Sequence, residues 1–119
     1  MAEWVFDKNG RTKIILDEFC FRDSMGRVVS WKNNFNVYNL RGQHIGWYEN
    51  GVLFDSKNRV LGFIRTRTGY IPSSPGLCGT PGMPGFSGIP GRPGFSGTPG
   101  KPGRGGWSKY DLESYFKEN

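Results

Sequence analysis

The sequence predicts an all-β protein: four 16-residue β-hairpin repeats in a quasi-four-fold radial arrangement, then a collagen-like or polyproline-II tail and a short C-terminal α-helix. Three observations lead to this prediction. A turn motif recurs four times at sixteen-residue spacing, apolar residues flank each motif at constant offsets, and glycine occupies every third position from Gly76 to Gly106. We expect a hairpin domain over residues 1–66, a linker over 67–75, a Gly-X-Y segment over 76–106 and an aromatic helix over 107–119.

The recurring motif has the chemistry of a hairpin loop. It reads "DKNGR", "DSMGR", "NLRGQ" and "DSKNR", starting at positions 7, 23, 39 and 55. Asp or Asn at the first position accepts a hydrogen bond from the backbone two residues on, and the fourth residue takes the left-handed conformation. Asn58 replaces glycine in the last motif, and Asn tolerates positive φ better than most residues. The predicted turn residues are Asp7, Gly10, Asp23, Gly26, Asn39, Gly42, Asp55 and Asn58.

Apolar residues lie two positions before each loop and eight positions after its first residue. They define a predicted core of Val5, Ile15, Phe21, Trp31, Val37, Trp47, Leu53 and Phe63. Because side chains alternate along a strand, we expect Val29, Ile45 and Leu61 to share the face of the large residues that follow them by two. The opposite face then carries the small residues Ser30, Gly46 and Gly62, where a neighbouring strand or a partner could approach closely.

A single hairpin of this kind cannot bury its apolar side alone, so the four hairpins must pack around a shared centre. A radial closure is the simplest arrangement. A linear run of hairpins is the alternative, and it would leave exposed edges at both ends.

The loops, together with "RVVSW", "QHIGWYENGVLFD" and "RVLGFI", resemble those of the bacterial four-fold beta flower family. The resemblance extends over essentially the whole chain, and the stretch from Gly42 to Gly51 is its most recognisable part. It implies four hairpins followed by a Pro-rich segment and a short Trp-containing C-terminus. It implies no catalytic residues, and the strict glycine period of the tail departs from the family pattern.

The tail repeats Gly-X-Y over ten triplets, with Pro at the third position of six. Collagen needs this period because only glycine fits where three polyproline-II chains meet. A homotrimeric triple helix, a polyproline-II strand packed on other chains or on its own domain, and a disordered linker all remain open. The repeated "PGFSG" at 84–88 and 93–97 indicates contacts every nine residues. The predicted assembly residues are Gly76, Gly79, Gly82, Gly85, Gly88, Gly91, Gly94, Gly97, Gly100, Gly103 and Gly106.

The last segment, "WSKYDLESYFKEN", predicts a short helix capped by Ser108, with Asp111 in its first turn. Its aromatic face provides candidate partner contacts at Trp107, Tyr110, Tyr115 and Phe116. Docking of this face on the chain's own β-domain is the alternative.

Composition gives no support for catalysis. His44 is the single histidine, and neither metal-ligand spacing nor a phosphate-loop motif occurs, so we expect no enzyme activity, cofactor or metal. Cys20 and Cys78 are expected to be reduced thiols, with a disulfide between them as the alternative. The N-terminus resembles neither a signal peptide nor a membrane span, so the expected location is the cytoplasm, with no membrane partner.

We therefore expect a structural or interaction protein that associates with itself, a trimer being favoured, or with another protein. One alternative is a nucleic-acid or anionic-glycan binder, because the net charge is +6 and Arg11, Arg27 and Arg59 recur in the loops. Exposed aromatic rings at Phe6, Tyr38 and Phe54 would then stack on bases or sugars. A phage-fibre or surface-adhesin subunit is a further alternative.

Overall fold

Eight strands and a helix make up the computed structural model, which describes residues 2–119. Met1, the first residue of the predicted hairpin domain, lies outside the described residues. The elements are β1 (Ala2–Phe6), β2 (Thr12–Asp17), β3 (Cys20–Asp23), β4 (Val28–Asn33), β5 (Asn36–Tyr38), β6 (His44–Glu49), β7 (Val52–Phe54), β8 (Val60–Ile64) and α1 (Leu112–Glu118). Each strand pairs antiparallel with the next, and β1 also pairs with β8. The sheet therefore closes into a barrel, which confirms the predicted β class and excludes a linear run of hairpins.

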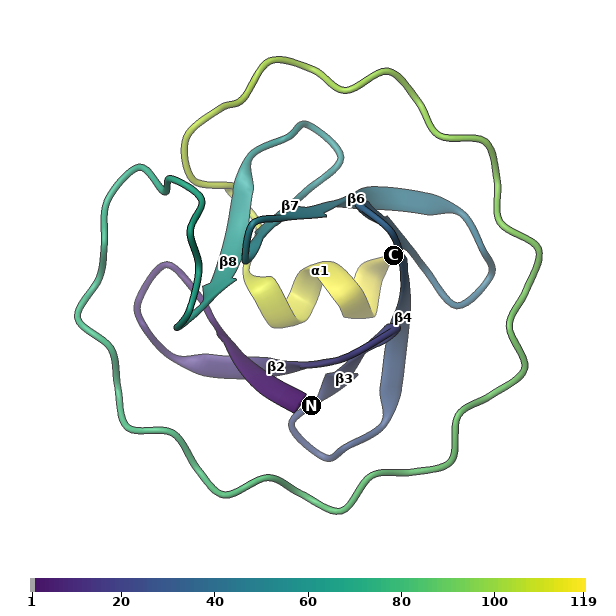
Figure 1. Cartoon of the computed structure of the whole chain (residues 1–119), viewed down its shortest axis with the longest axis horizontal. Helices are drawn as coiled ribbons and strands as arrows, with labels where there is room; N and C mark the ends of the chain where they lie inside the picture. Colours follow the sequence, from purple (N-terminus) through teal and green to yellow (C-terminus); the bar gives the residue numbers. More distant parts are fainter. Residues whose placement is uncertain (1) are drawn as a thin grey trace.

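Loops 1 to 4 (residues 7–11, 23–27, 39–43 and 55–59) project outward from this barrel (Figure 1). In loop 1, Asp7 Oδ1 accepts the backbone N–H groups of Asn9 and Arg11, each at 2.9 Å. The same two bonds form in the other three loops. The fourth loop residue has positive φ in every case, from 60° at Asn58 to 86° at Gly42. Local sequence alone therefore accounts for these loops.

A second set of turns, which the hairpin motif does not predict, lies between the hairpins. Glu18, Asn34 and Asn50, again sixteen residues apart, have φ between 51° and 56°. These turns connect β2 to β3, β4 to β5 and β6 to β7. Two of the three positive-φ residues are Asn, which tolerates this conformation, and this is the signal that could have revealed them.

Each hairpin carries a β-bulge beside its loop, and the bulge overturns one prediction. In β6, Tyr38 pairs with His44 and Val37 with Gly46, so Ile45 has no partner of its own. The extra residue reverses the alternation of side chains. Ile45 therefore joins the barrel interior, whereas Trp47 lies in a separate outer cluster. Leu61 and Phe63 are divided in the same way, and Val29 packs on the interior while Trp31 does not, so the predicted shared face is wrong.

Small residues of the inner face permit close strand contact. A Cβ on Gly46 would lie 2.2 Å from the carbonyl oxygen of Phe54, and one on Gly62 would lie 2.6 Å from that of Phe6. Distances this short exclude any side chain, so a neighbouring strand, and not a partner, occupies the space. Ser30, the third small residue, is fully buried.

The eight predicted core residues are all buried, but the barrel wall divides them. Val5, Phe21, Val37 and Leu53 point into the interior. Trp31, Trp47 and Phe63 lie in clusters outside that interior core.

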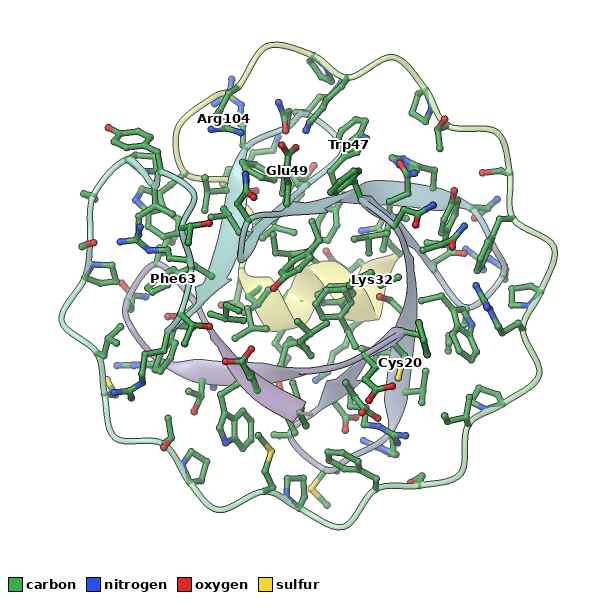
Figure 2. The ribbon with its side chains drawn as sticks, viewed as in Figure 1. Cys20, Lys32, Trp47, Glu49, Phe63 and Arg104 are labelled. Atoms are coloured by element: carbon green, nitrogen blue, oxygen red, sulfur yellow. The ribbon has the colours of Figure 1, made fainter. Side chains whose placement is uncertain are left out.

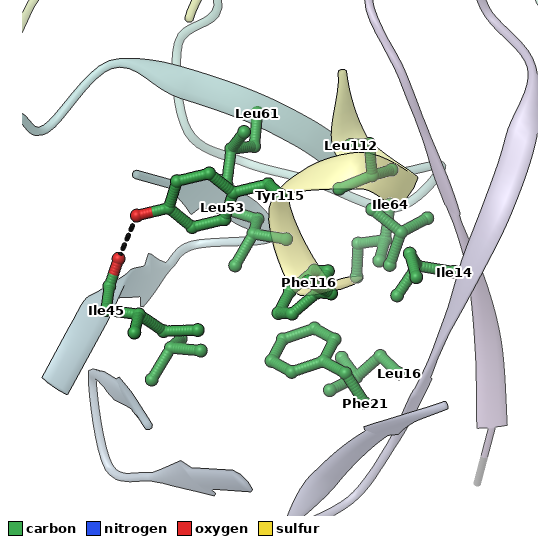
Figure 3. Packing of buried hydrophobic residues seen from close by; sticks show 12 residues of the cluster. Ile14, Leu16, Phe21, Ile45, Leu53, Leu61, Ile64, Leu112, Tyr115 and Phe116 are labelled. Atoms are coloured by element: carbon green, nitrogen blue, oxygen red, sulfur yellow. Dashed lines mark hydrogen bonds between the residues drawn. The ribbon is translucent and has the colours of Figure 1, made fainter. Parts of the chain in front are cut away.

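Helix α1 completes the interior core. Leu112, Tyr115 and Phe116 pack against the inward side chains of the strands (Figure 3). The ring of Phe116 stacks on Phe21 at 5.6 Å. Tyr115 donates its hydroxyl to the carbonyl oxygen of the bulged residue Ile45. The helix therefore fills the barrel and also bonds a buried backbone carbonyl at the bulge.

The start of α1 also differs from the prediction. Asp111, not Ser108, is the N-cap, and its carboxylate accepts the Ser114 N–H at 3.2 Å. Ser108 instead donates its hydroxyl to Asp55 at 2.6 Å. Because Ser108 contacts loop 4, the helix begins several residues later in the chain than predicted.

Candidate functional site in the belt and its seam

Residues 76–106, here called the belt, run around the outside of the barrel without helix or strand structure (Figure 1). The belt reaches each loop through one backbone hydrogen bond to the fourth loop residue. Its N–H groups donate from Cys78 to Gly10, Ser87 to Gly26, Ser96 to Gly42 and Gly105 to Asn58, with N···O distances of 2.8–3.1 Å. Successive anchors are therefore nine residues apart in the belt and sixteen residues apart in the barrel.

Proline placement explains this contact period. Proline has no N–H, so it cannot donate to a loop carbonyl. The third positions of the ten triplets are Pro except at Cys78, Ser87, Ser96 and Gly105, which are the four donors. The absence of proline at every third triplet is therefore the signal in the sequence that marks the anchor points.

Glycine is required on the loops at three of these four anchors, and Asn58 occupies the fourth. A Cβ on Gly10, Gly26 or Gly42 would lie within 2.0–2.1 Å of a belt carbonyl oxygen. The belt glycines differ, because a Cβ on any of the eleven predicted assembly glycines would meet no atom within 4 Å. The described chain therefore does not itself require a glycine at every third belt position.

Side chains from the belt cover the outer clusters of the barrel. Phe95 stacks on Tyr38 at 4.1 Å, and the Arg22 guanidinium lies 4.4 Å from the ring centre of Phe86. Lys101 forms an ion pair with Glu49 at 2.8 Å (Figure 2 shows Glu49 beside Trp47). A cation over an aromatic ring, as at Arg22 and Phe86, contributes about 0.5–2 kcal/mol.

The belt closes on the barrel at a seam beside loop 4. Trp107 forms a parallel bridge with Val60, whose N–H donates to Gly106 O at 2.9 Å. The Cγ of Arg59 would lie 2.8 Å from a Cβ on Gly105. This close contact explains why the belt residue at this anchor is glycine, whereas the belt residue at each of the other anchors is Cys or Ser.

The structure redistributes the candidate partner contacts. Tyr115 and Phe116 lie inside the barrel, so they are not available to a partner, and this part of the prediction is wrong. Trp107 packs on Phe63, and Tyr110 stays 38 % exposed. The alternative, docking of the terminal segment on its own β-domain, describes this structure.

The stacking rings proposed for a nucleic-acid or glycan binder are also not available. Phe6, Tyr38 and Phe54 are at most 3 % exposed. The positive charge, however, is concentrated at the periphery. The four loops and the belt together hold nine Lys or Arg and three Asp, a net +6 that equals the net charge of the whole chain. Peripheral charge of this size attracts anions.

Burial shifts the pKa values of two titratable groups of the barrel. Burial lowers the pKa of His44, and burial together with nearby Glu3 raises the pKa of Tyr48 to about 12. Cys20 is buried and Cys78 exposed, and both are free thiols. Among residues 2–119, no group of three His, Cys, Asp or Glu side chains is placed to hold a metal ion.

No helix in the described part of the chain has the length and apolar character needed to cross a bilayer. Comparison with curated proteins and with solved structures finds no significant match. The family model described as "4-fold beta flower protein" matches residues 3–116, which include the barrel, the belt and most of α1. The chain therefore belongs to the 4-fold beta flower family.

Proposed function

We propose that the protein is a non-catalytic structural and interaction protein whose belt both encloses the barrel and provides a surface for self-association. The observation that carries this proposal is the match between the nine-residue contact period of the belt and the sixteen-residue period of the loops. Four regular anchors hold an extended chain in place and leave its outer side open. A long, regularly supported backbone of this kind is suited to contact with another chain.

The belt glycines favour a second copy of the same chain as the partner. Their Cβ positions are open, so the fold of one chain does not explain the period. Polyproline-II chains that pack side by side need glycine where their backbones meet, and collagen joins three such chains. We therefore favour a trimer in which collagen-like contacts form between belts. Met83 and Ile89, which are 44 % and 62 % exposed on the belt, would be covered in such contacts.

Sedimentation velocity on the full chain tests this proposal. We expect a species larger than the monomer, with a mass near three chains. Gly91→Ala places a methyl group on the open side of the belt, so it should weaken association and leave the thermal unfolding of the barrel unchanged. A wild-type protein that sediments as a monomer throughout the micromolar range would contradict self-association.

A further inference from the structure

A cavity of about 550 Å³ lies at the seam, between loop 4 and the last turn of the belt. Lys57 and Arg59 of loop 4 line one side, and Lys109 and Tyr110 line another. Pro102, Gly103 and Gly105 complete the wall. Figure 2 labels Arg104, which lies in this part of the belt.

The cations of this cavity have no carboxylate partner within residues 2–119. Lys57, Arg59 and Lys109 take part in no ion pair there, and all three side chains are exposed. Asp55 is the acidic residue in the lining, and it is 1 % exposed. The cavity therefore combines three cations with one buried carboxylate.

At the seam, the carboxylate of Asp55 bonds groups other than the Arg59 guanidinium. In loop 2 the equivalent Arg27 donates through Nε to Asp23 Oδ2 at 3.0 Å. In loop 4 the corresponding oxygen, Asp55 Oδ2, already accepts the hydroxyl of Ser108 at 2.6 Å. Asp55 Oδ1 accepts the backbone N–H groups of Lys57 and Arg59. Both oxygens of Asp55 are therefore engaged, one by the closing segment and one by the backbone of loop 4.

We propose that this cavity binds a nucleotide, with its phosphate between Lys57, Arg59 and Lys109. A guanidinium donates two parallel hydrogen bonds to a phosphate, and lysine adds a point charge. Inorganic phosphate would leave most of the volume empty, whereas Tyr110 and Pro102 supply a partly apolar wall for a base or sugar. The nucleotide can be free or part of a single strand, since both present the same group.

Isothermal titration calorimetry on the full chain tests the site, with adenosine 5′-monophosphate as the probe. The double variant Lys57→Ser/Arg59→Ser should weaken binding at least about tenfold. The matched control is Lys8→Ser/Arg11→Ser in loop 1, which removes the same charge from the same kind of loop and should change binding less than about twofold. Circular dichroism of both variants establishes that the barrel remains folded.

Further probes separate the sources of the ligand. Inorganic phosphate and adenosine should each bind more weakly than the monophosphate, and Tyr110→Ser should affect the monophosphate more than inorganic phosphate. Tighter binding of a single-stranded oligonucleotide, still lost in Lys57→Ser/Arg59→Ser, would identify the polymer as the source. Equal losses in the two double variants, equal binding of inorganic phosphate, or no binding of the monophosphate at millimolar concentration would overturn the proposal.

Discussion

The backbone N–H of Ser87 donates to the carbonyl oxygen of Gly26 at 3.1 Å, which joins the belt to loop 2. The buried guanidinium of Arg22 strengthens this junction, because its Nη1 lies 2.7 Å from Gly26 O and 2.8 Å from Ser87 O. Asp17 pairs with the same guanidinium at 2.8 Å. One anchor of the belt is thus linked through a buried charge to the turn between β2 and β3.

Replacing Ser87 by Pro should release this anchor. Proline removes the N–H group that donates to Gly26, and a hydrogen bond makes a net contribution of about 0.5–1.5 kcal/mol to stability. We expect faster amide hydrogen exchange in the belt on both sides of position 87, with the barrel amides still protected. Ser87→Ala keeps the N–H and is the control. If the two variants exchange alike, the backbone bond does not hold the belt.

Replacing Gly42 by Ala should displace the belt from loop 3. The residue has φ +86°, and its Cβ would lie 2.1 Å from Gly94 O. The left-handed conformation alone costs about 1–2 kcal/mol for a residue with a side chain. Gly88→Ala on the open side of the belt should leave the free energy of unfolding in urea nearly unchanged. A Gly42→Ala protein as stable as Gly88→Ala would refute the described contact.

Replacing Tyr115 by Phe tests how α1 is held in the barrel. The hydroxyl donates to Ile45 O and accepts the Ser56 N–H at 3.0 Å. Its loss removes a partner from two backbone groups, of which the Ile45 carbonyl is buried, so we expect a loss of about 1–3 kcal/mol of stability in urea unfolding. Tyr110→Phe removes a hydroxyl from a partly exposed ring and should cost less than about 0.5 kcal/mol. Similar losses in both would argue against the special role of Tyr115.

The pH dependence of stability near neutrality should come from His44. Burial lowers the pKa of His44 from its ordinary value of 6.5. As the pH falls through that value, the unfolded chain binds a proton that the folded chain does not, so the free energy of unfolding decreases. We expect this decrease between about pH 7 and pH 5. His44→Gln should flatten the profile, and an unchanged slope would assign the effect to other groups.

Much of the fold could be predicted from the sequence, because it depends on interactions between residues close together in the chain. The loop residues Asp7 and Gly10 act within five residues, so the motif was sufficient to place the hairpins. The offsets of Val5 and Ile15 likewise identified buried positions. The seam was not accessible, because Ser108 and Asp55 are 53 residues apart and nothing in either neighbourhood indicates their bond.

The sequence by itself determined the repeats, the strands and the spacing of the anchors, because turn conformation, side-chain alternation and the missing N–H of proline are local properties. Only the tertiary structure decided that bulges turn Ile45 inward, that α1 fills the barrel, and that the Gly-X-Y segment encircles its own chain. These outcomes depend on closure of β1 against β8, which creates the interior and the circumference that the terminal segments occupy. A closed surface exists only after distant strands have paired, so no local pattern describes it.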